Sequence, residues 1–286
     1  MKPRVAFQGE LGAFSEEAVR ALYRDAVVPV PMREFRDAGE AVSAGEVEGA
    51  VLPVENSIAG SVGPVYDVLA TLPLRVVGET VLPIRHCLLG VPGATAERVR
   101  RVLSHPVALA QCNTYLRERT DVEAVAVYDT AGAARDVAGR GDPKVAAIAS
   151  RLAAERYGLD VLTPDVQDRH DNQTRFFAVV AEGRDARGLE STPPSGGERK
   201  TAILMETANR PGALVEVLLA FAEEKVNLTK LESRPAPEPW TYRFILELVT
   251  ADGAAEASAL GRAEAAAVAF RVLGRFDPWK PSAAPT

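Results

Sequence analysis

The sequence predicts an α/β protein built from two folded domains, and three observations lead to this prediction. Over residues 1–181, short apolar stretches alternate with stretches of helical spacing, which is typical of a largely parallel sheet covered by helices. Residues 201–277 instead follow the order βαββαβ, the ferredoxin-like arrangement. Between them, residues 182–200 hold four glycines, two prolines and few apolar residues, so we expect a flexible linker there.

In the first segment, apolar runs predict strands, and apolar residues at helical spacing predict the helices between them. Strands are expected over 4–8, 47–54, 74–91, 102–104, 124–128, 145–149 and a last stretch that ends at 181, and helices over 13–23, 106–117, 131–138 and 151–157. Pro83 interrupts the stretch 74–91, where we expect the chain to cross into a second sub-lobe and to return late. A cleft between two sub-lobes is the default ligand site.

The second segment is justified in the same way. After a strand over 201–206, Asn209 is expected to cap a helix that has Pro211 in its first turn. Apolar residues over 214–221 then follow the i, i+3, i+4, i+7 spacing of a helix. Further strands are expected over 227–233, 240–249 and 271–276, and an alanine-rich helix over 254–269. The proline-containing tail 278–286 is expected to fray.

Composition narrows the class of function. The 286 residues carry a formal net charge of −6, which disfavours a nucleic acid or an anionic membrane as partner, because such binding needs a basic surface. No apolar run reaches the roughly 18 residues of a membrane-spanning helix. Two cysteines, and three histidines without ligand spacing, predict neither a disulfide framework nor a metal site. Because no secretory signal opens the sequence, we expect a cytoplasmic protein.

Four motifs of the first segment contain polar residues at expected strand ends and helix starts, where α/β proteins place their ligands. They are Phe7-Gln8-Gly9-Glu10-Leu11-Gly12-Ala13-Phe14-Ser15, Pro53-Val54-Glu55-Asn56-Ser57, Leu103-Ser104-His105-Pro106 with Gln111-Cys112, and Asp171-Asn172-Gln173-Thr174-Arg175-Phe176. The sequence has neither a dinucleotide fingerprint with its acidic partner nor a P-loop, so no redox or nucleotide cofactor is expected.

In this order, the four motifs resemble those of the prephenate dehydratase family. In the second segment, Gly212-Ala213-Leu214-Val215 and Glu232-Ser233-Arg234-Pro235 are similar to motifs of a phenylalanine-binding ACT regulatory domain. The resemblance covers residues 4–277. It implies a two-lobed, periplasmic-binding-protein-like catalytic domain over 1–181 and a ferredoxin-like ACT domain over 201–277. No segment resembling chorismate mutase accompanies them, so we expect that activity to be absent.

The resemblance implies a carbon–oxygen lyase of phenylalanine biosynthesis. Prephenate loses its ring carboxylate and its C4 hydroxyl, giving phenylpyruvate, CO2 and water, without a cofactor. Stabilising the departing hydroxide requires a positioned hydrogen-bond donor. Thr174 is the first choice for that donor, and the further catalytic residues are Asn56, Ser104 and Gln111. Asn56 has the alternative role of a turn residue, and Ser104 that of a helix N-cap.

Four more residues are expected to bind substrate, namely Ser57, Thr130, Arg175 and Phe176. Thr130 is expected at the start of a helix, where a carboxylate binds well. In a regular strand, Thr174 and Phe176 face one side and Arg175 the other. Arg175 therefore either lies at an irregular strand start or supports the site from behind, and a buried or bidentate salt bridge is its alternative role.

For the second segment, the resemblance implies binding of L-phenylalanine and feedback inhibition. The effector residues that it implies are Asn209, Gly212, Ala213, Leu214, Glu232 and Ser233. Backbone donors of the loop 209–214 suit the carboxylate of an amino acid, and Leu214 offers an apolar wall. Glu232 and Ser233 approach from a strand, in the same chain or across a dimer interface. Because the edges of such a sheet can pair, we expect at least a dimer, and the resemblance implies a tetramer built as a dimer of dimers. A domain that only dimerises is the alternative.

Two other functions stay open at this point. Arogenate dehydratase runs the same elimination on the aminated substrate, and the two substrates differ only at a keto or amino side chain. A non-catalytic amino-acid-sensing binding protein has the same two-lobed fold, but the set of Asn56, Ser104, Gln111 and Thr174 argues against it. An extracytoplasmic solute receptor is disfavoured by the missing signal peptide.

Overall fold

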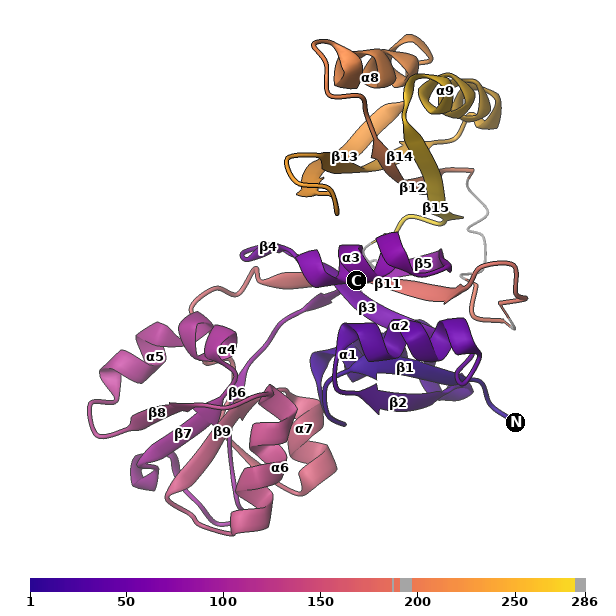
Figure 1. The fold of residues 1–286 in the computed structure, drawn as a ribbon. Helices are drawn as coiled ribbons and strands as arrows, with labels where there is room; N and C mark the ends of the chain where they lie inside the picture. Colours follow the sequence, from indigo (N-terminus) through magenta and orange to yellow (C-terminus); the bar gives the residue numbers. More distant parts are fainter. Residues whose placement is uncertain (187, 191–196, 281–286) are drawn as a thin grey trace.

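The computed structural model describes residues 1–186, 188–190 and 197–280, and these residues fold around three β-sheets (Figure 1). Two of the sheets belong to the first segment, and we call the parts built on them the first lobe and the second lobe. The third sheet, together with two helices, forms the C-terminal domain. Within the described ranges, no helix combines the length and the apolar character that crossing a membrane requires.

The first lobe contains β1 (Arg4–Gln8), α1 (Phe14–Tyr23), β2 (Val28–Met32), α2 (Phe35–Ala44), β3 (Gly49–Asn56), β4 (Gly60–Ser61), α3 (Gly63–Thr71), β5 (Leu74–Pro83) and β11 (Gln173–Ala181). Its sheet has the order β2-β1-β3-β11-β5, with β4 paired to β3. β1 is parallel to its neighbours, whereas β11 is antiparallel to β3 and β5. Phe176 and Phe177 belong to two different apolar cores, so the sheet is buried on both faces.

The second lobe contains β6 (Cys87–Gly90), β7 (Arg101–Ser104), α4 (Pro106–Gln111), α5 (Asn113–Glu118), β8 (Glu123–Ala126), α6 (Thr130–Arg140), β9 (Val145–Ala149), α7 (Arg151–Tyr157) and β10 (Asp160–Thr163). Its sheet has the order β10-β6-β9-β7-β8. β7 is parallel to β8 and β9, and β6 is antiparallel to β9 and β10. Both lobes are therefore mixed sheets, where the sequence predicted largely parallel ones.

Two segments carry the chain between the lobes. Residues 84–86 join β5 to β6, and residues 164–172 join β10 to β11 (Figure 1). The segments lie side by side, because the Ile84 N–H donates to the Asn172 carbonyl at 2.8 Å and the Val166 N–H donates to the His86 carbonyl at 2.9 Å. The returning chain enters the first lobe as β11, a central strand between β3 and β5.

The glycine turn after β1 ties the first lobe to the second. Tyr157 donates its hydroxyl to the Leu11 carbonyl at 2.7 Å, and Ser150 donates to the Gly12 carbonyl at 2.7 Å. Gly12 has φ +93°, and a Cβ at this position would lie 2.8 Å from the Cα of Ala153. Only glycine fits such a close approach, so the turn fixes how the two lobes meet.

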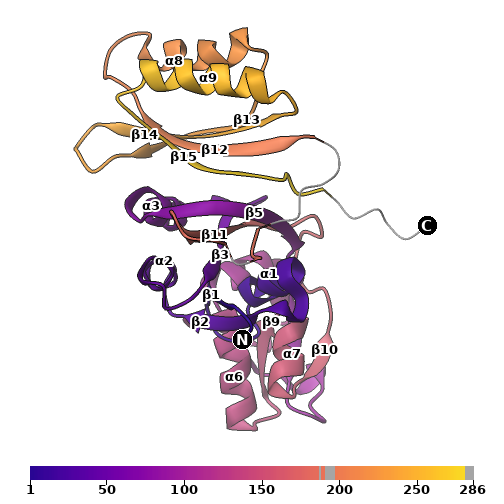
Figure 2. The ribbon, with the colours of Figure 1, turned by 90° about the vertical axis from the view of Figure 1, so that its right-hand side faces the viewer.

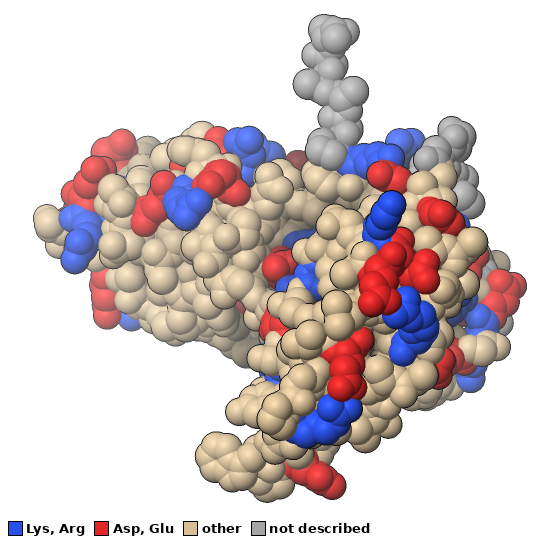
Figure 3. All heavy atoms as spheres, turned by 90° about the horizontal axis from the view of Figure 1, so that it is seen from above, with Lys and Arg blue, Asp and Glu red and all other residues tan. Residues whose placement is uncertain are grey.

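The C-terminal domain contains β12 (Arg199–Glu206), α8 (Ala213–Glu223), β13 (Asn227–Pro235), β14 (Tyr242–Thr250), α9 (Gly253–Ala266) and β15 (Ala269–Phe276). Its antiparallel sheet has the order β13-β14-β12-β15, as the βαββαβ reading of the sequence predicts. Both helices cover one face (Figure 2). On the face seen from above, acidic and basic side chains lie next to one another, and neither sign forms one large patch (Figure 3).

The other face of the C-terminal sheet rests on the first lobe (Figure 2). Ile245 and Leu273 belong to the same apolar core as Leu52 of β3. β15 approaches β5 so closely that a Cβ on Gly274 would lie 2.1 Å from the carbonyl oxygen of Val76. The sheet of the C-terminal domain is therefore buried on both faces.

The predicted linker is partly folded. Ala186 and Leu189 are buried in the core of the first lobe, and Tyr23 donates its hydroxyl to the Leu189 carbonyl at 3.0 Å. The prediction was wrong for these residues because two isolated apolar side chains are enough to anchor the segment. Residues 187 and 191–196 of the predicted linker, and 281–286 of the predicted tail, lie outside the described residues.

The start of α8 also differs from the prediction. Asn209 was expected to cap this helix, with Pro211 in its first turn. Instead the N-cap is Gly212, with φ +83°, and the helix begins at Ala213. Glycine adopts this left-handed conformation readily, so the chain turns once more before the helix starts.

Candidate active site

A cleft of about 580 Å³ lies between the two lobes and takes its walls from both of them. The first lobe contributes the β3–β4 hairpin, β11 and the starts of α1 and α3. The second lobe contributes α4 and the start of α6. Of the residues predicted to act on substrate, the cleft brings together Asn56, Gln111, Thr130, Thr174 and Phe176.

Thr174 and Asn56 form a hydrogen-bonded pair at the wall of the cleft, directly opposite each other on β11 and β3. Asn56 Nδ2 donates to Thr174 Oγ1 at 2.9 Å. Asn56 Oδ1 accepts from the backbone N–H groups of Ile58 at 3.0 Å and Ala59 at 2.8 Å, which fixes the orientation of the amide. Because the amide nitrogen can only donate, the Thr174 hydroxyl keeps its own hydrogen for a group in the cleft.

Gln111 is oriented by a histidine that the sequence interpretation did not single out. His86 lies in the segment that crosses from the first to the second lobe, and its Nε2 lies 2.9 Å from Gln111 Oε1. Burial lowers the pKa of the His86 imidazole, so the ring is neutral and donates from Nε2. With its oxygen engaged in this way, Gln111 presents its NH2 group to the cleft. The only sequence signal for His86 was its place after Pro83, where the crossing was expected.

Helix starts, rather than basic side chains, make the cleft suitable for an anion. The first residues of α1, α3 and α6 line it, including Ser15, Gly63 and Thr130. None of the described residues that line it is a lysine or an arginine. Unpaired N–H groups and the helix dipole give the starts of α1 and α3 a positive potential, whereas at α6 the Asp129 carboxylate accepts the Gly132 N–H at 2.7 Å. In the described part of the chain, no group of three or more His, Cys, Asp or Glu side chains could hold a metal ion.

Two sequence profiles of known families match the chain. The profile of prephenate dehydratase matches residues 5–184, which include both lobes and the cleft, and the profile of the ACT domain matches residues 201–259. The chain belongs to the prephenate dehydratase family. The predicted family and the predicted fold class, a two-lobed α/β catalytic domain followed by a ferredoxin-like ACT domain, are confirmed.

Other members of the family are similar over nearly the whole chain. "Arogenate dehydratase/prephenate dehydratase 2, chloroplastic" of Arabidopsis thaliana is 41% identical over 285 residues, which are 96% of this chain and 72% of that protein. A protein of Komagataeibacter europaeus named "Bifunctional N-acyl-homoserine lactone acylase/prephenate dehydratase" is 38% identical and covers 91% of this chain and 89% of its own. A solved prephenate dehydratase from Arthrobacter aurescens, in complex with L-Phe, is 32% identical with a TM-score of 0.85 and covers 96% of this chain and 90% of its own.

Two predicted site residues of this prephenate dehydratase family member lie outside the cleft. Ser104 is fully buried, and its hydroxyl donates to the Ile148 carbonyl at 2.6 Å. His105, rather than Ser104, is the N-cap of α4. The Ser57 hydroxyl accepts from the backbone N–H of Gln173 at 3.0 Å. The predictions that Ser104 and Ser57 contact substrate are not supported, because both hydroxyls bind backbone groups of neighbouring segments.

Arg175 also does not reach the cleft. It lies between Thr174 and Phe176, and strand alternation turns its side chain to the opposite face of the sheet. There it pairs with Glu247 of the C-terminal domain at 2.7 Å. Burial alone would lower the pKa of the Arg175 guanidinium, but hydrogen bonds and charge from Glu247 outweigh burial and raise it. The salt-bridge alternative is therefore the observed one, and the predicted contact with substrate is not supported.

The predicted effector residues are divided between two faces of the C-terminal sheet. Asn209 and Gly212 are exposed in the loop before α8, and Ala213 and Leu214 begin that helix on the helix-covered face. The Glu232 carboxylate instead points to the first lobe, where it contacts Ser61 and lies 3.2 Å from Lys230. Ser233 is exposed on β13. Glu232 is thus turned away from the loop with which it was expected to act.

Proposed function

We propose that this chain catalyses the decarboxylating dehydration of prephenate to phenylpyruvate, CO2 and water. The observation that carries the proposal is the Thr174 hydroxyl, held by Asn56 at the wall of the cleft with its hydrogen left for a bound group. Electrons of the bond to the ring carboxylate move into the ring, the C4–oxygen bond breaks, and one proton from solvent completes the departing water. Thr174 donates a hydrogen bond to the departing oxygen, where negative charge develops.

The other cleft residues bind the substrate in this proposal. The NH2 group of Gln111 and the hydroxyl of Thr130 are donors for the two carboxylates. Phe176 provides an apolar wall for the ring that becomes aromatic. In this arrangement, neutral donors and helix starts bind the substrate. The departing oxygen then lies near the Thr174 hydroxyl and not near a strong acid.

Dehydration of arogenate is a second candidate reaction. Asp129 places a carboxylate on the wall of a cleft whose described lining residues include no lysine or arginine. A carboxylate attracts the ammonium group that arogenate carries and prephenate lacks. The Arabidopsis thaliana relative described above carries both activities in its name.

The test is turnover of both substrates by the purified chain, measured as kcat/KM for phenylpyruvate formed from prephenate and for phenylalanine formed from arogenate. A higher value for prephenate supports the first reaction, and a higher value for arogenate replaces it with the second. Failure to turn over either substrate would contradict both reactions and favour the amino-acid-sensing binding protein.

We further propose that L-phenylalanine binds the C-terminal domain and inhibits the reaction. The complex of the Arthrobacter aurescens enzyme with L-Phe supports this, as does the exposed loop 209–212 with its small residues before α8. Backbone N–H groups there suit a carboxylate, and Leu214 offers an apolar contact. Adding L-phenylalanine to the assay should lower turnover, and unchanged turnover at saturating L-phenylalanine would contradict this role.

Self-association through the C-terminal domain, as a dimer or tetramer, is part of the proposal. Val215 and Leu219 are exposed one helical turn apart on α8, and Leu231 is exposed on the edge strand β13. Large apolar side chains at a helix surface and a free sheet edge are suited to contact with a second copy.

A further inference from the structure

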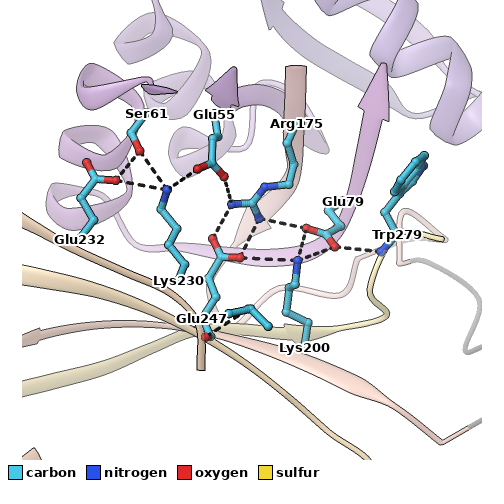
Figure 4. A network of polar contacts seen from close by, with 10 residues as sticks. Glu55, Ser61, Glu79, Arg175, Lys200, Lys230, Glu232, Glu247 and Trp279 are labelled. Carbon is cyan, nitrogen blue, oxygen red and sulfur yellow. Dashed lines mark hydrogen bonds and ion pairs between the residues drawn. The ribbon is translucent and has the colours of Figure 1, made fainter. Parts of the chain in front are cut away.

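A cluster of polar side chains, which we call the interdomain cluster, lies between the C-terminal sheet and the first lobe (Figure 4). The first lobe contributes Glu55, Ser61, Glu79 and Arg175, and the C-terminal domain contributes Lys200, Lys230, Glu232 and Glu247. Three positive charges meet four negative ones here. The chemistry proposed above uses none of these residues.

Arg175 lies at the centre of the interdomain cluster. Each of its two terminal nitrogens lies 2.7 Å from one oxygen of Glu247, so the two side chains form a bidentate pair across the domain boundary. Arg175 also donates to Glu55 at 2.8 Å and to Glu79 at 3.1 Å. The side chains of Glu247 and Glu79 are only 2% exposed, so water cannot replace either partner without the domains separating.

Lys230 makes a second bridge to the first lobe. Its ammonium donates to Glu55 Oε1 at 3.0 Å and to Ser61 Oγ at 2.9 Å. Ser61 lies in the β3–β4 hairpin and lines the cleft. One residue of the C-terminal domain thus touches both the strand that carries Asn56 and the wall of the cleft.

These bridges end one residue away from the catalytic pair. In the ladder of β3 and β11, Thr174 is paired with Asn56, and the next pair is Arg175 with Glu55. The register then shifts, so the ladder is irregular at this point. The backbone hydrogen bonds of an irregular ladder fix its geometry less firmly. Here Arg175 and Glu55, the pair next to Thr174 and Asn56, are both held by side chains of the C-terminal domain.

We propose that Glu247 and Lys230 of the C-terminal domain are positioning residues for the reaction, acting through the interdomain cluster on the Thr174–Asn56 pair. Contacts from the C-terminal domain then help to position Thr174 and Asn56 even when no effector is bound. This inference rests on the proposed function, because its first readout is turnover.

Glu247→Gln is the sharpest test. Glutamine keeps the shape of the side chain but removes its charge, which leaves Arg175 without its bidentate partner. We expect kcat to fall about tenfold or more while KM changes less than about threefold, because a displaced Thr174 affects the transition state more than substrate binding. The matched control is Glu223→Gln, which removes an exposed ion pair with Arg262 on the helix face of the same domain and should leave both constants unchanged.

Because Glu247 is buried and its variant risks misfolding, Lys230→Met provides a second test. It should lower kcat in the same direction and by a smaller factor. Hydrogen exchange gives a readout independent of turnover. Amides over 55–57 and 173–176 should exchange faster in both variants than in the wild type and in the Glu223→Gln control.

The outcomes separate the two proposals. An inactive wild type contradicts the proposed function, and hydrogen exchange then still tests the coupling. An active wild type, with both variants folded and within about twofold of its kcat, would overturn the inference alone. A raised KM at unchanged kcat would overturn it too, because that result assigns the charges to substrate binding.

Discussion

The hydroxyl of Thr174 is the group on which the proposed chemistry depends most. Thr174→Ala removes the donor and should lower kcat by about 100-fold or more, because a donor to developing negative charge is worth that much in a buried site. Thr174→Ser keeps the donor and should stay within about tenfold of wild type. The measurement is kcat at saturating substrate, with thermal denaturation to verify folding. Near-normal turnover by Thr174→Ala would remove this residue from the mechanism.

The partly buried carboxyl of Glu17 on α1 predicts a pH dependence of stability. Burial raises the pKa of the Glu17 carboxyl to about 7. The folded chain therefore binds a proton that the unfolded chain, with a pKa near 4.5, has released. Stability from this group is lost as the pH rises from 4.5 through 7, by about 1–3 kcal/mol.

Glu17→Gln should remove that loss. The variant should match the wild type near pH 5 and be more stable than it near pH 8, measured by urea denaturation at both values. Glu40→Gln is the control, since Glu40 forms an exposed ion pair with Arg36 on α2. A difference between Glu17→Gln and wild type that is equal at the two pH values would contradict the role of ionisation.

The sequence predicted the direction of a side chain correctly where strand alternation alone determines it. It failed where the contact of a side chain depends on which strand lies next to it. The opposite facing of Thr174 and Arg175 follows from strand geometry, and the structure has it. The hydroxyl of Ser104 instead binds the carbonyl of Ile148 on a neighbouring strand. Strand order is set by the whole sheet, so no local pattern around Ser104 could reveal this contact.

At the scale of elements, the close approach of β15 and β5 gives a prediction. Gly274→Ala places a methyl group against the backbone of Val76 and should lower the free energy of unfolding by about 1–3 kcal/mol. Gly261→Ala, on α9 with nothing within 4 Å, should instead raise it by about 1 kcal/mol through helix propensity. Chemical denaturation measures both. Equal effects of the two substitutions would show that the close approach is not rigid.

Helices and strands with a regular spacing of apolar residues could be predicted from the sequence. Features that depend on packing against other elements could not. The strand expected over 240–249 is present as β14, but nothing in the sequence indicated that Ile245 and Glu247 would be buried against the first lobe. β2 was missed because Pro29 and Pro31 argue against a strand. The two prolines are tolerated because β2 is the outermost strand of its sheet. A proline there lacks an N–H, but no hydrogen bond between central strands is lost.

At the scale of the whole molecule, the exposed apolar side chains of the C-terminal domain predict an assembly. Val215→Lys combined with Leu219→Lys places two charges on the exposed face of α8 and should shift the mass in solution towards a monomer, measured by light scattering. The exposed Val107→Lys on α4 is the control away from that domain. An unchanged mass in the double variant would place the contact elsewhere.

The central place of β11 in the first lobe has a consequence for how the protein folds during its synthesis. On the ribosome, every strand of the second lobe emerges before β11 does, so that lobe can complete its sheet while the first lobe is still open between β3 and β5. The open edges of these two strands can pair wrongly with other chains until residue 181 has left the exit tunnel. Thr174 belongs to this last strand, so a nascent chain gains the hydroxyl proposed for catalysis in the same step that closes its sheet.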